Sequence, residues 1–106
     1  MRELSFKINI MKEGFHLTPN EIGSIYQKRD KPIQIQGKSR IFSFVSEVEG
    51  KVERYTNTLY NNKYQRENTL TIKDRATGKK YRGYVFEGGD DLDDMQIVSG
   101  SHFSLV

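Results

Sequence analysis

Apolar and polar residues alternate along several stretches of this chain, and this alternation restricts the possible folds more than any other feature. In residues 4–10 every second residue is apolar, and Ile33 and Ile35 repeat the pattern. Successive side chains of a strand point to opposite faces of a sheet, so a period of two predicts half-buried strands. Composition agrees, because the chain has one alanine, whereas isoleucine, valine, threonine, phenylalanine and tyrosine total 33. We therefore expect a mainly β protein.

Turn signals divide the chain into about seven short antiparallel strands. Three pairs of neighbouring strands are predicted, each joined by a turn that contains glycine: residues 41–48 and 51–58, residues 65–73 and 79–86, and residues 95–98 and 102–106. Gly50 provides the first turn, and Gly78 takes the left-handed position of the second. The third turn is Ser99-Gly100-Ser101. Residues 41–48 begin apolar on both sides, which favours a central strand.

One segment, LTPNEIGSIYQKR, has the pattern of a helix. Thr18 is a suitable N-cap, Pro19 occupies the first helical position and Glu21 completes a capping box. A short helix from Pro19 to about Arg29 is predicted. Residues 1–106 are then a single domain, a small barrel or a two-sheet sandwich with one short helix near residues 19–29.

Composition excludes several classes of protein. The chain has no cysteine, which excludes a disulfide framework, a cysteine-rich zinc site and a thiol nucleophile. No apolar run approaches the about 18 residues of a membrane-spanning helix. The alternating start is unlike the continuous apolar core of a signal peptide. We expect a cytoplasmic protein that has no contact with a membrane.

Charge is distributed unevenly along the chain. All 17 lysines and arginines lie in residues 1–86 together with nine acids, a net charge of +8, whereas residues 87–106 hold five acids and no lysine or arginine, a net charge of −5. A basic body with an acidic C-terminal segment could bind a polyanion or a protein of complementary charge.

Cations and tyrosines alternate in the predicted hairpins. Single-stranded nucleic acid is bound by this combination, because bases stack on aromatic rings while cations follow the phosphates. The alternative is an ordinary solvent-exposed hairpin, since these residue types are common in strands. The candidate nucleic-acid-binding residues are Arg54, Tyr55, Tyr64, Arg66, Lys80, Arg82 and Tyr84.

The acidic stretch at residues 87–94 is the second candidate site. Its spacing lacks the alternating ligands and closing glutamate of a calcium-binding EF-hand loop, so we expect no metal site. It is either a solvated loop or a surface for a basic partner, in which an apolar residue among the acids would be an anchor. The candidate partner-binding residues are Glu87, Asp90, Asp91, Leu92, Asp93 and Asp94.

No motif indicates catalysis. The chain has no phosphate-binding loop of the Walker type, no nucleophile elbow and no dinucleotide fingerprint. His16 and His102 lie in different sequence contexts, neither at the spacing of a catalytic motif. We expect a non-enzymatic binding protein without a cofactor, most simply one that binds nucleic acid through its basic hairpins. The alternative is an inhibitor or accessory factor, of the type found in phages and mobile elements, that places residues 87–94 in the basic groove of a nucleic-acid enzyme. Its oligomeric state is left open.

Overall fold

The computed structural model describes residues 14–56 and 62–106. Their elements in chain order are α2 (Pro19–Tyr26), β1 (Ile33–Ile35), β2 (Lys38–Arg40), β3 (Phe42–Val48), β4 (Val52–Thr56), β5 (Asn62–Asp74), β6 (Lys80–Gly89), the 3₁₀ turn η2 (Leu92–Asp94) and β7 (Ile97–Leu105). The prediction of a mainly β chain with about seven antiparallel strands and one short helix is confirmed. The strand predicted at residues 4–10 lies outside the described residues.

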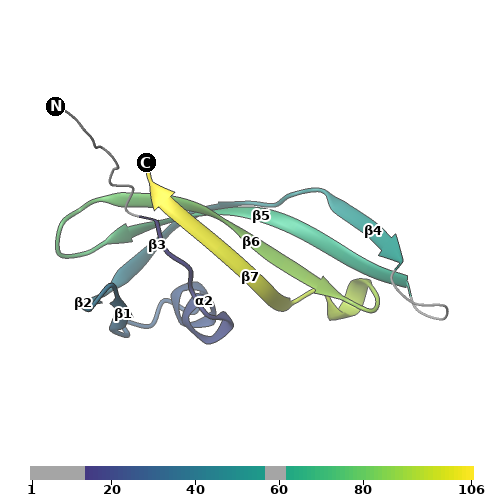
Figure 1. Ribbon diagram of the computed structural model, residues 1–106, viewed down its shortest axis with the longest axis horizontal. Helices are drawn as coiled ribbons and strands as arrows, with labels where there is room; N and C mark the ends of the chain where they lie inside the picture. Colours follow the sequence, from purple (N-terminus) through teal and green to yellow (C-terminus); the bar gives the residue numbers. More distant parts are fainter. Residues whose placement is uncertain (1–13, 57–61) are drawn as a thin grey trace, which may run out of the picture.

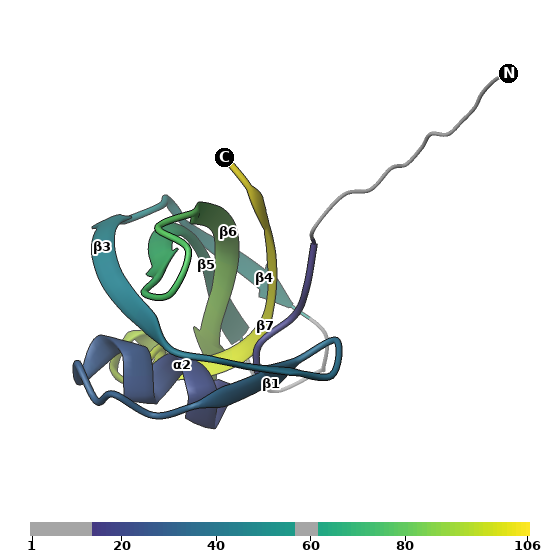
Figure 2. The ribbon, with the colours of Figure 1, turned by 90° about the vertical axis from the view of Figure 1, so that its left-hand side faces the viewer.

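The strands form two antiparallel sheets. The larger has the order β3-β5-β6-β7, with β4 also paired to β5, and the smaller is the β1–β2 hairpin. The larger sheet curves over α2 and β1–β2 without closing into a barrel within the described residues (Figures 1 and 2). No helix among these residues has the length and apolar character needed to cross a membrane.

The hairpin predicted around Gly50 is wrong. β3 and β4 do not pair with each other; both pair with β5, one after the other along the same edge. This places β3 at an edge of the sheet instead of in its centre. The glycine is needed for close approach to β5, since a Cβ atom at Gly50 would lie 1.7 Å from the carbonyl oxygen of Glu67. The Gly50 N–H donates a hydrogen bond of 2.8 Å to Oδ1 of Asn68. The break between β3 and β4 therefore leaves this backbone donor paired.

The second predicted hairpin is confirmed. β5 and β6 pair from Tyr64 to Lys73, and Gly78 has the left-handed φ of 77°. Asp74 stabilises the turn, because its Oδ1 accepts hydrogen bonds from the backbone N–H groups of Ala76 (2.8 Å) and Thr77 (3.3 Å).

The third predicted pair is wrong, because residues 97–105 form the single strand β7 along β6. Gly100 lies opposite Phe86, next to a shift in register between Phe86 and Glu87. The glycine and its neighbouring serines therefore lie beside a β-bulge, which uses the same residue types as a turn. On the other edge of β7, Phe15 pairs with Phe103.

The helix begins as predicted and ends earlier. Thr18 and Glu21 form the reciprocal hydrogen bonds of a capping box, and Pro19 occupies the first turn. The helix ends at Tyr26 instead of near Arg29, because Lys28 adopts a left-handed φ of 57° that a helix cannot contain.

The core occupies only one part of the larger sheet. Apolar residues of α2, β1 and residues 15–17 pack against one face of the sheet around Leu70, Val85 and Phe103, which are fully buried. Beyond α2 no described element forms a second layer against the sheet (Figure 1). We call the two parts the packed half and the projecting half. The packed half contains α2, β1, β2, β3, residues 69–74 of β5, residues 80–85 of β6 and residues 101–105 of β7. The projecting half contains β4, residues 62–68 of β5, residues 86–89 of β6, η2 and residues 97–100 of β7.

Candidate functional site

The alternation of side chains along β6 separates an inner face, which carries the core, from an outer face. Tyr81, Val85 and Glu87 are buried on the inner face, whereas Arg82 and Tyr84 are exposed on the outer one. No other described element covers the outer face of the packed half (Figure 2). Exposed cations here are therefore available to a ligand.

Strand pairing places a row of cations next to one exposed tyrosine on this outer face. Lys73 pairs with Lys80 across β5 and β6, and Tyr84 pairs with His102 across β6 and β7. Arg82 lies between the two pairs, and half of the Tyr84 surface is exposed. We call Lys73, Lys80, Arg82, Tyr84 and His102 the basic face.

No described acid forms an ion pair with a cation of the basic face. Among the described residues, Lys73, Lys80 and Arg82 form no ion pair, and Arg82 donates only a long hydrogen bond of 3.4 Å to the hydroxyl of Thr71. On the same face of β5, Glu67 pairs with Phe86 farther along the strands.

The seven residues predicted to bind nucleic acid do not share one surface. Lys80, Arg82 and Tyr84 lie together on the basic face. Arg54, Tyr64 and Arg66 lie on the inner face of the projecting half, because Arg54 pairs with Tyr64 and Arg66 pairs with the buried Glu87. Tyr55 lies opposite Lys63 on the outer face of the projecting half.

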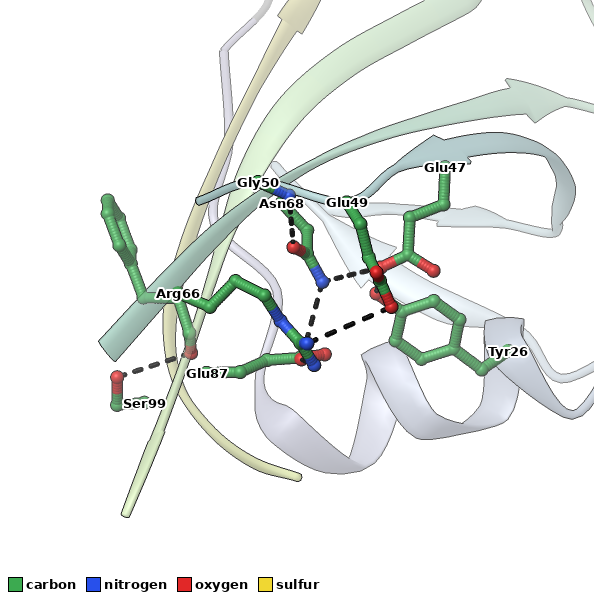
Figure 3. A network of polar contacts seen from close by, with 9 residues as sticks. Tyr26, Glu47, Glu49, Gly50, Arg66, Asn68, Glu87 and Ser99 are labelled. Atoms are coloured by element: carbon green, nitrogen blue, oxygen red, sulfur yellow. Dashed lines mark hydrogen bonds and ion pairs between the residues drawn. The ribbon is translucent and has the colours of Figure 1, made fainter. Parts of the chain in front are cut away.

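An open groove of about 680 Å³ lies on the inner face, where α2 ceases to cover the sheet. Its polar lining includes Tyr26, Glu47, Glu49, Arg66, Asn68 and Glu87 (Figure 3). Ile97 and Val98 form part of its apolar lining. Three carboxylates against one guanidinium give these groups a net charge of −2, so the groove is unfavourable for phosphate.

Asn68 connects the polar groups of the groove. Its buried Nδ2 donates to Glu47 (2.9 Å) and to Glu87 (3.3 Å), and its Oδ1 accepts from Gly50. Arg66 donates to Glu87 at 2.8 Å and lies 3.7 Å from a carboxylate oxygen of Glu49. These contacts hold Arg66 inside the groove, where it is not available to a polyanion on the outer face.

Tyr26 links α2 to this network. Its hydroxyl donates a hydrogen bond of 2.8 Å to Glu47. Burial, together with the hydrogen bond to the Glu47 carboxylate, raises the pKa of Tyr26 far above its ordinary value. The hydrogen bond to Glu87 raises the pKa of Arg66. Tyr26 therefore remains a protonated donor and Arg66 a cation.

The acidic stretch is divided by the fold. Glu87 belongs to the groove, whereas Asp91 caps η2 by accepting hydrogen bonds from the backbone N–H groups of Asp93 (2.9 Å) and Asp94 (3.1 Å). Asp90 lies 3.5 Å from the ammonium of Lys63, and Leu92 is 59% exposed. Within the described ranges, no three or more acids, histidines or cysteines are grouped as metal ligands.

Lys73 and His102 belong to the basic face but were not predicted from the sequence. The contact between His16 and His102 was not predicted either. Lys73 could have been found from the register of the β5–β6 hairpin, which places it opposite Lys80. The sequence places His16 and His102 in unrelated contexts, but their ring centroids lie 4.9 Å apart. No local signal predicts that contact, because the residues are far apart in the chain and meet only after Phe15 pairs with Phe103 of β7.

Comparison with known proteins gives no relative. The chain matches no protein-family model, and it has no significant match among curated proteins or solved structures. Function must therefore be inferred from the surfaces described above.

Proposed function

We propose that this protein is a non-enzymatic binding protein and that its basic face binds single-stranded nucleic acid. The observation that carries the proposal is that Lys73, Lys80 and Arg82 lie in line with the exposed Tyr84 on an uncovered sheet face, with no ion-pair partner among the described residues. In single-strand binding, each base offers a flat surface to an aromatic ring while ammonium and guanidinium groups neutralise the phosphates. Tyr84 supplies the ring and the neighbouring side chains supply the charge.

The position of the acids supports this proposal. The carboxylates of Glu47 and Glu87 lie on the inner face, with the sheet between them and the basic face. The aspartates at residues 90–94 lie in the projecting half, beyond the end of β6. An approaching phosphate chain therefore meets cations first on the outer face of the packed half.

The test is binding of a fluorescent single-stranded oligonucleotide, measured by anisotropy over a range of salt concentrations. Three phosphate contacts predict a slope of about −2 in log affinity against log salt, since each contact on a single strand contributes about −0.7. Arg82→Glu is expected to weaken binding about tenfold or more, because repulsion replaces attraction. Tyr84→Ala should weaken binding by about 1–3 kcal/mol without changing the salt slope.

The matched control is Arg54→Glu, which changes the net charge by the same amount on the inner face of the projecting half. It should bind nearly as well as the wild type. Equal losses in the two arginine variants would show that only net charge matters and would contradict the proposal, as would a salt slope near zero.

A second candidate function is favoured by one observation. Leu92 and Ile97 are 59% and 63% exposed in the projecting half, which also holds the exposed Asp93, a combination suited to a basic protein partner with an apolar pocket. In the same assay, nucleic-acid affinity that is insensitive to Arg82→Glu would favour this candidate. Capture of a basic protein from the native cell that withstands nuclease and is lost in Asp93→Lys would then support it.

A further inference from the structure

His16 and His102 are neighbours across two paired segments. Phe15 and Phe103 exchange two backbone hydrogen bonds of 2.8 and 2.9 Å, and Phe15 is bridged to Phe103 in antiparallel fashion. His16, which follows Phe15, and His102, which precedes Phe103, are therefore opposite each other, with their side chains on the same face. Both imidazoles are exposed, and their ring centroids are 4.9 Å apart.

The tautomer of His16 is determined by its contact with Ser101. Nδ1 of His16 hydrogen-bonds to the carbonyl oxygen of Ser101. A carbonyl oxygen can only accept, so Nδ1 carries the proton and Nε2 of the neutral ring has a lone pair. Ser101 is itself fixed, because its buried hydroxyl donates to the carbonyl of Leu17 (2.8 Å) and accepts from the Leu17 N–H (2.9 Å).

For His16 this is the hydrogen bonding that metal-binding histidines commonly have. A metal-binding histidine commonly donates its second ring N–H to a carboxylate or backbone carbonyl, which orients the ring and increases the basicity of the binding nitrogen. With metal–nitrogen bonds of about 2.0–2.1 Å and bond angles of about 90–110°, the centroids of two imidazoles on one ion lie about 4.5–5.2 Å apart. The observed 4.9 Å falls within that interval.

We propose that His16 and His102 form an open binding site for a divalent transition-metal ion. Imidazole nitrogen suits Cu²⁺, Ni²⁺ and Zn²⁺, and the usual order of stabilities makes Cu²⁺ the tightest. Since the described residues contain no group of three or more possible ligands, they supply two ligands to the ion. Water completes the coordination, because both rings are exposed. The proposal does not depend on nucleic-acid binding, since the two imidazoles are sufficient for it.

The experiment is a calorimetric titration of the full chain with Cu²⁺ or Zn²⁺ alone in a non-coordinating buffer, together with electron paramagnetic resonance of the Cu²⁺ form. We expect one ion per chain and two coordinated nitrogens. His16→Asn and His102→Asn should each lower the affinity at least about tenfold, and the double variant should remove the site. Ca²⁺ and Mg²⁺ should not bind there, because they require oxygen ligands.

Tyr84→Phe is the matched control. Residue 84 lies opposite His102 on the same face, and the phenylalanine side chain carries no metal ligand. Its metal affinity should equal that of the wild type. Because the histidines are exposed, their variants should retain the circular dichroism spectrum of the wild type. One coordinated nitrogen, or an unchanged affinity in either histidine variant, would overturn the proposal.

Discussion

β5 and β6 run through both halves of the molecule, yet the inner face of these strands is apolar in one half and charged in the other. In the packed half it carries Leu70 and Val85, both fully buried beneath α2 and β1–β2. In the projecting half it carries Arg66, Asn68 and Glu87. The alternation of side chains continues along both strands, but the residues facing inward become polar at the end of α2, where the apolar core stops. A period of two therefore predicts a strand and does not predict what covers it.

The change from apolar to polar occurs at Asn68, where the groove begins. This residue is buried, and its amide bonds to both neighbouring carboxylates and to the backbone of Gly50. A buried amide is costly only when its donors and acceptors are unpaired. The network thus allows the sheet to leave the core without leaving this amide unpaired.

The largest expected effect is on the free energy of unfolding, when an apolar side chain is truncated in the packed half and, for comparison, in the projecting half. Phe103→Ala removes a fully buried ring that stacks on Phe15 with centroids 5.7 Å apart, and it should lower the free energy of unfolding by about 3–5 kcal/mol. Val52→Ala, in the projecting half, should change it by no more than about 0.5 kcal/mol because Val52 is 40% exposed. Urea unfolding measures both, and equal losses would remove the distinction between the halves.

The next effect concerns the joint between β3 and β4. Gly50→Ala places a Cβ atom within 1.7 Å of the Glu67 carbonyl oxygen, so the two strands must separate, at a cost of about 1–3 kcal/mol in the free energy of unfolding. The control is Gly23→Ala in α2, where a Cβ atom has no neighbour within 4 Å. That substitution should stabilise the protein by about 0.4–1 kcal/mol. Effects of the same sign in chemical unfolding would refute the account of Gly50.

The smallest effect tests the link between α2 and the groove. Tyr26→Phe removes the hydrogen bond to Glu47 and should lower the free energy of unfolding by about 0.5–1.5 kcal/mol at neutral pH.

This cost should depend on pH. The pKa of Tyr26 is raised in the folded protein, so above the ordinary tyrosine pKa of about 10 the unfolded chain loses this proton first. Above that pH the unfolded state binds fewer protons than the folded state, so wild-type stability falls as pH rises. The difference between wild type and Tyr26→Phe should therefore shrink in alkaline urea titrations, and a constant difference would contradict the assignment.

Much of the fold could be predicted from local sequence signals. The capping box of α2 and the hairpin closed at Gly78 were correct, because in each the deciding interactions lie within a few residues. The errors at Gly50 and Gly100 have a common cause. Glycine permits a turn, a bulge or a close backbone approach, and only the partner strand decides among them.

The candidate site was predictable only in part for a related reason. Alternation placed Lys80, Arg82 and Tyr84 on one face, and the structure has them there. Alternation could not place β4 relative to β6, because the predicted pairing of residues 41–48 with 51–58 was wrong. Arg54 and Arg66 were therefore assigned to the same surface as Lys80 and Arg82. The proximity of His16 and His102 depends on a pairing between the two ends of the described chain, which no short segment specifies.

The break at Gly50 also bears on how copies of this protein would meet one another. A straight edge strand with unpaired backbone groups is a template on which another molecule can add a strand, and this is how many β proteins aggregate. Here the outer edge of the sheet is divided into runs of seven residues in β3 and five in β4, and a register shift interrupts β3 between Phe44 and Ser46. No long ladder can form against an edge that changes direction so often, so these irregularities oppose fibril growth at this edge.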